Sequence, residues 1–276
     1  MKKFFMLLAI ALPMVFTTAC GDDDDDPTAP INFTVSELAV YTNNAETLTL
    51  DSKNPGVLTW ASSDAFVATV SQNGEVRGQH AGTATITATN AEGRKATAKV
   101  TVLPQNDNFN IPCLSWGANA NQVKSATESA ISGLVYREDL SETTPDADGF
   151  TTSVFMTGAY LPSYSYVFGN GKLANSTITI TLDQDMEGDL EGFLQDRYKM
   201  YGETETEAFY MNADELSKAT MKIVLDYIGV ADENPTISAT WMENPDYAGS
   251  RAAGNVDAAA AFNKARAAVK GVKATL

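Results

Sequence analysis

The sequence predicts a multidomain protein in which an all-β sandwich is followed by an α+β domain with a largely antiparallel sheet. The length of 276 residues suits roughly two domains. Residues 31–104 contain short runs of strand-forming residues separated by glycine-containing turns, which is typical of a sandwich. From residue 108 onward, apolar residues at helical spacing alternate with strand-like runs, which predicts helices packed on a sheet over 108–276.

The chain begins with a short leader-like segment. Lys2 and Lys3 precede an apolar run from Phe4 to Phe16. A run of this length is too short to cross about 30 Å of hydrocarbon at about 1.5 Å per helical residue. We therefore interpret residues 1–19 as a signal peptide that takes no part in the fold.

The end of this leader, Thr17-Thr18-Ala19-Cys20, resembles the lipobox of bacterial lipoproteins. The resemblance implies cleavage before Cys20, acylation of its thiol and a lipid anchor in a membrane. Several acyl chains, each contributing about 0.8 kcal/mol per buried CH₂ group, hold a protein durably in a bilayer. The alternative is an ordinary secreted protein in which Cys20 carries no lipid.

A run of acids follows the lipobox cysteine: Asp22, Asp23, Asp24, Asp25 and Asp26. Such a block of like charges stays solvated rather than folding. Acid directly after the lipidated cysteine resembles the export signal that sends some lipoproteins to the outer face of the outer membrane, and the alternative is a charged spacer. We expect residues 20–30 to be a lipidated acidic tether, and the protein to be anchored in the outer membrane at the cell surface.

The sandwich region carries a specific pattern. Trp60 to Asp64, Asn73-Gly74 and Gly82 to Ala88 occur in an order that resembles the bacterial Ig-like domain, group 2. Trp60 is a large core filler, and Asn73-Gly74 supplies the positive φ angles of a tight hairpin. The resemblance implies surface display, adhesion or spacing, and sometimes carbohydrate contact. His80 lies in a predicted turn, where we expect it to be solvated rather than catalytic.

Residues 108–276 predict the element order α-β-β-β-α-β-β-α. Helices are expected over 120–132, capped by Asn119 or Asn121, from Leu190 to Tyr201, and after a capping Asp257. Strands are expected over 152–156, 164–168, 177–182, 221–228 and 236–242, with Asn170-Gly171 as a hairpin turn. Trp116 to Asn119, together with Tyr166 to Leu173, resembles small bacterial lipoprotein modules that pack helices on an antiparallel sheet. That resemblance implies binding to proteins rather than catalysis, and it assigns no functional residue.

Local features of this second domain allow two interpretations each. Tyr164, Tyr166 and Phe168 share one strand face, which suits either a platform on which a sugar ring stacks or a core. Asp183 begins an acidic run that imitates the start of a calcium-binding EF-hand loop. Leu194 occupies the position that needs a glutamate, and the acids equally suit a helix N-terminus. Cys113 is expected to be a small buried hydrophobe beside Trp116.

Composition excludes several classes of function. The net charge of -16 argues against a protein whose main role is binding nucleic acid. One His and two Cys make a His/Cys zinc cluster or a haem site improbable. The sequence contains no nucleophile elbow, P-loop or dinucleotide motif, so we expect neither an enzyme nor a bound cofactor or metal. Residues 105–276 carry 24 acids and 12 bases, which favours cationic or neutral partners.

These observations support a cell-envelope lipoprotein that acts as a non-enzymatic adhesion or binding protein, with the Ig-like domain as spacer. Two alternatives stay open. The second domain binds glycans or acts on them through carboxylates, since paired acids serve glycoside hydrolysis. Otherwise, it binds a protein, as an inhibitor or assembly factor does.

Overall fold

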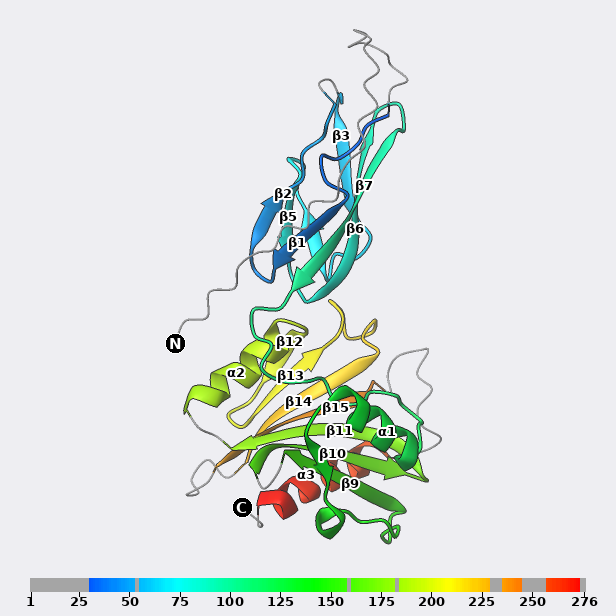
Figure 1. Ribbon diagram of the computed structural model, residues 1–276, viewed down its shortest axis with the longest axis vertical. Coiled ribbons are helices and arrows are strands. Elements are labelled where there is room, and N and C mark those ends of the chain that lie inside the picture. Colours follow the sequence, from blue (N-terminus) through cyan, green and yellow to red (C-terminus); the bar gives the residue numbers. More distant parts are fainter. Residues whose placement is uncertain are drawn as a thin grey trace.

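The computed structural model describes residues 30–52, 55–157, 160–181, 184–228, 235–244 and 257–273. A narrow N-terminal sandwich lies end-on against a broader C-terminal domain (Figure 1). The expected signal peptide, Cys20 and the acidic run from Asp22 to Asp26 lie outside the described residues, and their assignments stay predictions. None of the helices in the described ranges is both long and apolar enough to span a membrane.

The N-terminal sandwich consists of two small sheets. Its strands are β1 (Glu37–Tyr41), β2 (Ala45–Thr47), β3 (Leu58–Ser62), β4 (Ala68–Val70), β5 (Glu75–Gly78), β6 (Gly82–Asn90) and β7 (Lys95–Leu103). One sheet has the order β1-β7-β6-β3 and the other β2-β5-β4. Burial alternates along β6 and β7, so one face of the larger sheet packs on the smaller one around Trp60.

The predicted turn at Asn73-Gly74 is present between β4 and β5, but of these two residues only Gly74 has a positive φ, of +79°. A Cβ at this position would approach the Leu48 carbonyl oxygen to 2.7 Å and the Trp60 ring to 2.8 Å. Any larger residue would therefore push Trp60 out of the sandwich core.

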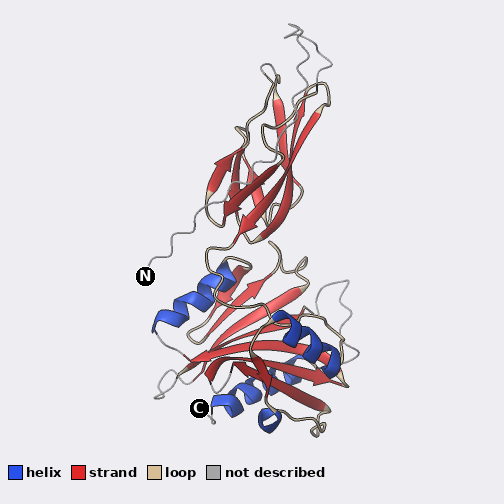
Figure 2. Cartoon of the chain, in the orientation of Figure 1, coloured by secondary structure: helices blue, strands red, loops and turns tan. Residues whose placement is uncertain are grey.

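The C-terminal domain is built on one large antiparallel sheet (Figure 2). Its strands are β8 (Leu134–Tyr136), β9 (Phe150–Thr157), β10 (Tyr160–Gly169), β11 (Lys172–Thr181), β12 (Lys199–Glu203), β13 (Glu207–Met211), β14 (Met221–Ile228) and β15 (Thr236–Glu243). Its helices are α1 (Ala120–Ala130), the short 3₁₀ helix η1 (Glu138–Leu140), α2 (Gln184–Gln195) and α3 (Ala258–Lys273). The strand order is β12-β13-β14-β15-β11-β10-β9-β8, and every neighbouring pair is antiparallel.

Several predicted local signals are confirmed. Of the two candidate caps, Asn119 caps α1, and the structure adds a reciprocal capping box with Gln122. Asn170 and Gly171 both have positive φ and join β10 to β11 as a hairpin. The carboxylate of Asp257 accepts hydrogen bonds from the first backbone amides of α3, at 2.9 Å from Ala259 and 3.2 Å from Ala260.

The second helix differs from its prediction. The sequence predicts a helix from Leu190 to Tyr201, whereas α2 ends at Gln195 and the chain continues as β12 from Lys199. The chain leaves the helix after Gln195 because Asp196 and Arg197 form hydrogen bonds to Asn106, in the interdomain linker that follows β7. Strands β8, β12 and β13 are not among the predicted elements.

The two faces of the large sheet are covered differently. One face carries aromatic and aliphatic side chains that pack with Val123 of α1 and Phe193 of α2 in one core cluster. The other face is covered by α3, whose Ala261 and Ala265 pack against Phe150 and Val167. Successive residues of a strand point to opposite faces, so each central strand contributes to both layers.

Candidate functional site: an acidic cavity beside the domain junction

Of the two interpretations of the Tyr164, Tyr166 and Phe168 face, platform or core, burial favours the core. Tyr164, Tyr166 and Phe168 are 2 %, 0 % and 1 % exposed. The Tyr166 hydroxyl accepts a hydrogen bond from Thr127 Oγ1 at 2.9 Å, and burial raises its pKa to about 12. The three rings therefore do not form a surface on which a sugar can stack. They fill the core because the aromatic face is the one that α1 and α2 close.

Cys113 and His80, which the sequence analysis singled out, both pack against other side chains. Cys113 is half-buried against the core together with Trp116, and its carbonyl oxygen accepts a hydrogen bond from Ser176 at 2.6 Å. His80 is half-buried rather than fully solvated. Its ring stacks on Phe66 at a centroid distance of 4.0 Å, and its Nδ1 lies 2.7 Å from the Phe66 carbonyl oxygen.

The sequence that imitates a calcium loop begins at Asp183, outside the described residues. From Gln184 its backbone is helical, as α2, and Leu194 is buried in the core. An EF-hand loop would need this stretch to wrap around an ion. In the part of the chain that the structure describes, no group of three or more His, Cys, Asp or Glu side chains is arranged to hold a metal ion.

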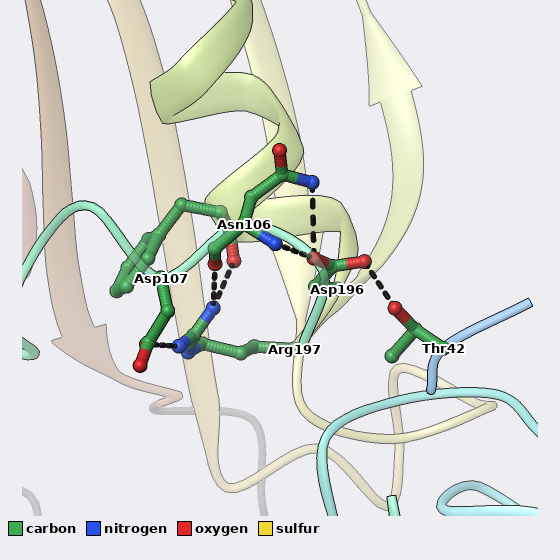
Figure 3. A network of polar contacts seen from close by, with 6 residues as sticks. Thr42, Asn106, Asp107, Asp196 and Arg197 are labelled. Atoms are coloured by element: carbon green, nitrogen blue, oxygen red, sulfur yellow. Dashed lines mark hydrogen bonds and ion pairs between the residues drawn. The ribbon is translucent and has the colours of Figure 1, made fainter. Parts of the chain in front are cut away.

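The junction between the domains is organised around Asp196 (Figure 3). Its carboxylate is 4 % exposed and accepts hydrogen bonds from Thr42 Oγ1 at 2.5 Å, from the Asn106 backbone amide at 2.6 Å and from Asn106 Nδ2 at 3.0 Å. Its carbonyl oxygen accepts the Ala81 amide at 2.6 Å. A buried carboxylate is stable only when hydrogen-bond donors surround it. Since these donors come from the sandwich and from the linker, Asp196 ties both to the end of α2.

Arg197 reinforces the same junction. Its guanidinium forms an ion pair with Asp107 and donates to the carbonyl oxygens of Asn106 at 2.9 Å and Phe193 at 3.1 Å. It also lies over the Phe193 ring, at 3.9 Å from the centroid. A Cβ at Gly192 would approach the Asn106 side chain to 2.7 Å, so a glycine lets the linker lie directly on α2.

Next to this junction is a cavity of about 400 Å³. Its lining is dominated by glutamates and tyrosines from α2, β12, β13, β14 and the β12–β13 turn: Glu191, Gln195, Met200, Glu203, Thr204, Glu205, Glu207, Ala208, Tyr210 and Tyr227. Met200 belongs to this lining and is 45 % exposed. Its side chain gives the cavity an apolar edge beside an acidic lining.

The electrostatics of the cavity are negative. Burial, assisted by the charges of Glu191 and Glu203, raises the pKa of Tyr210 to about 12. Glu191 accepts a hydrogen bond from the Tyr227 hydroxyl, and Glu207 lies 3.6 Å from Arg266. The cavity therefore favours a positively charged group, whereas its Met200 edge favours apolar contact.

Sequence reasoning did not find this site. It recognised an acidic second domain and placed some of its acids near a helix start. The glutamates of the cavity come from α2 and from a β12–β13 hairpin that the pattern did not predict. The only sequence signal is the Glu203-Glu205-Glu207 alternation, which a solvated loop shows equally well.

Comparison with known proteins identifies the first domain. Residues 28–101 match the family model of the bacterial Ig-like domain (group 2). The N-terminal sandwich is a bacterial Ig-like domain. This match covers about a quarter of the chain, so it describes the domain rather than the whole protein. No curated protein matches the chain.

Similarity to solved structures is distant. An intimin mutant from EHEC O157:H7 is 14 % identical, with a TM-score of 0.21, over 42 % of this chain and 74 % of that one. An intimin fragment in complex with the Tir intimin-binding domain is 14 % identical, with a TM-score of 0.24, over 52 % and 61 %. PcdhgB3 EC1-4 is 11 % identical, with a TM-score of 0.24, over 71 % and 45 %. These values carry no argument about function.

Proposed function

We propose that this protein is a lipid-anchored binding protein of the bacterial cell surface. In this proposal Cys20 carries the lipid and the acidic run sends the chain outward. The Ig-like domain is the spacer and the C-terminal domain the non-enzymatic binding module. The order of the segments supports this assignment, because tether, spacer and binding module follow one another along the chain.

The observation that carries the proposal is the Asp196 junction. A spacer presents a binding module in a defined direction only if the joint between them resists bending. Here a buried carboxylate bonds to the Ig-like domain through Thr42 and to the linker through Asn106. Hydrogen bonds to an ionised group contribute about 1.5–3 kcal/mol each, so opening the joint is costly.

The acidic cavity is the part of the binding module that best fits a partner of opposite charge. Its lining suits a Lys or Arg side chain, whose apolar stem lies along the exposed Met200 while its charge faces the glutamates. This chemistry favours a protein ligand. The glycan alternative loses the support of the aromatic platform, because those rings lie in the core.

Anchoring is tested with the full chain expressed in a Gram-negative host. Wild type is expected in the membrane fraction, and Cys20→Ala in the soluble envelope fraction. Cys113→Ala is the matched control, because it removes the other thiol and leaves the anchor intact. Co-fractionation of Cys20→Ala with the membrane would contradict the lipid anchor.

Surface display is tested by adding protease to intact cells. The C-terminal domain is expected to be cleaved without permeabilisation, while a periplasmic marker stays intact. A protein that is cleaved only after the outer membrane is opened would refute surface display. Replacing the Asp22–Asp26 run with serines tests whether these acids act as an export signal, and the variant is then expected to be protected from protease.

A further inference from the structure

The face of the large sheet beneath α3 carries many polar side chains beside Phe150 and Val167, although it is buried. Its central strands β10, β11 and β15 present hydroxyl and amide side chains, each at most 2 % exposed: Ser163, Ser165, Asn175, Thr177, Thr179, Thr236, Ser238 and Thr240. We call these residues the hydroxyl layer. The register places them in adjacent rows, with Ser163 opposite Thr179 and Thr179 opposite Ser238. A sheet face under a helix is normally apolar.

Most of the hydroxyl layer finds no hydrogen-bond partner in the described chain. Thr177 and Thr240 bond to each other at 3.0 Å. Polar atoms in the layer that lack a partner among the described residues are Ser163 Oγ, Ser165 Oγ, Asn175 Nδ2, Thr179 Oγ1 and Thr236 Oγ1. A buried polar group without a partner destabilises the fold, and native proteins keep few of them. Their concentration on one face therefore points to a function.

The helix that covers this layer is poorly matched to it. The buried side chains of α3 are Ala261, Ala265 and Val269, which offer no polar atom and little apolar area. Charged groups hold the helix at its flanks. Lys264 pairs with Glu142 and with Asp146, and Arg266 pairs with Asp226 at 2.6 Å.

We propose that the hydroxyl layer is a binding face for a neutral glycan and that α3 is its displaceable cover. Ser and Thr hydroxyls both donate and accept, as the hydroxyls of a sugar do, so the two sets can satisfy each other. None of the eight residues of the layer is charged, and the carboxylate beside it, Asp226 opposite Ser238, is paired with Arg266. A ligand of the layer therefore needs hydrogen-bonding groups rather than charge. An apolar ligand would leave the same atoms unpaired.

This site goes beyond the proposed function, because it lies under α3 whereas α2 lines the acidic cavity, and because it has a different ligand chemistry. It is independent of the lipid anchor as well. The test below uses purified protein in solution, so its failure leaves surface display untouched, and the failure of surface display leaves this site untouched.

The first experiment measures binding of neutral hexasaccharides to the purified full-length chain. Maltohexaose, cellohexaose and chitohexaose are titrated, and backbone hydrogen exchange is followed in the same samples. We expect saturable binding to at least one of them, accompanied by faster exchange of α3 amides. Binding that leaves the exchange of α3 unchanged would overturn its role as a cover.

Variants locate the site. Ser163→Ala/Ser165→Ala is expected to weaken binding roughly tenfold, because each lost hydrogen bond contributes to affinity. Its stability to urea is expected to stay equal to that of wild type or to rise, since the removed hydroxyls lack partners. Ser153→Ala, on the aromatic side of β9, is the matched control and is expected to bind as wild type. Glycan binding that is insensitive to the double substitution would overturn the assignment.

A third variant loosens the cover. Lys264→Gln removes the ion pairs to Glu142 and Asp146, so a larger fraction of molecules has the layer open and apparent affinity is expected to rise several-fold. Absence of saturable binding in both wild type and Lys264→Gln would overturn the proposed ligand. Light scattering on the same samples tests one explanation for absent binding. A dimer would point to a second copy's α3, rather than a glycan, as the occupant of the layer.

Discussion

The aromatic and hydroxyl faces of the C-terminal sheet come from alternate residues of the same strands, yet they are built for different purposes. Tyr164 and Tyr166 lie in a well-packed core, whereas Ser163 and Ser165, their immediate neighbours, lie under a helix that offers them no partner. Burial alone therefore does not identify a core. The two faces differ in whether the covering helix gives the side chains beneath it apolar contacts or hydrogen-bond partners.

The largest expected effect concerns the aromatic face. Phe155→Ala removes a fully buried ring that packs against Tyr136 and Tyr166, and it should lower the free energy of unfolding by about 3–5 kcal/mol. Urea denaturation measures the change. The matched control is Val154→Ala on the opposite face, for which a smaller loss is expected because fewer atoms are removed. Equal losses would mean that both faces are packed alike.

A second effect of the aromatic face appears at alkaline pH. Burial raises the pKa of Tyr166 to about 12, so the folded protein holds this proton more tightly than the unfolded chain does. The stabilisation is fully present below pH about 10 and is lost as pH rises toward about 12. Urea titrations at pH 8 to 11 should show the free energy of unfolding falling as the pH rises, and Tyr166→Phe should make this fall less steep. An equally steep fall in the variant would contradict the assignment.

The hydroxyl face is expected to respond in the opposite direction. Thr179→Val replaces an unpartnered hydroxyl with a methyl group of similar shape, and it should leave stability unchanged or raise it by about 1 kcal/mol. Thr177→Val is the comparison, since it breaks the bond to Thr240 and should lower stability. A marked loss for Thr179→Val would show that its hydroxyl is hydrogen-bonded in the folded protein.

The smallest expected effect is at the acidic cavity, where the aromatic face meets solvent. Glu203→Gln/Glu205→Gln should weaken binding of a hexalysine peptide several-fold, with stability changed by less than about 0.5 kcal/mol. Glu138→Gln/Asp148→Asn removes the same charge at exposed positions outside the cavity lining and is the control. Equal weakening by both pairs would mean that net charge, not the cavity, attracts the peptide.

Local signals in the sequence predicted their own surroundings well. The helix cap at Asn119, one of two candidates, the Asn170-Gly171 hairpin and the Asp257 cap depend on residues a few positions apart, and all are present. The same rules missed β12, whose side chains are largely exposed and show no alternation of burial. An edge strand of this kind is stabilised by pairing with β13, which lies beyond the reach of a local pattern.

Composition and short-range periodicity are enough to predict the Ig-like domain, the acidic character of the second domain and the alternation that separates Tyr164 from Ser165. They do not predict which face becomes the core or which glutamates converge on one cavity. Nor do they predict that Asp196 joins the domains through Thr42, a residue far away in the chain. The physical reason is that burial and hydrogen-bond partners depend on contacts between distant segments. A strand presents side chains on two faces, and only the packing of other elements decides what each face contacts.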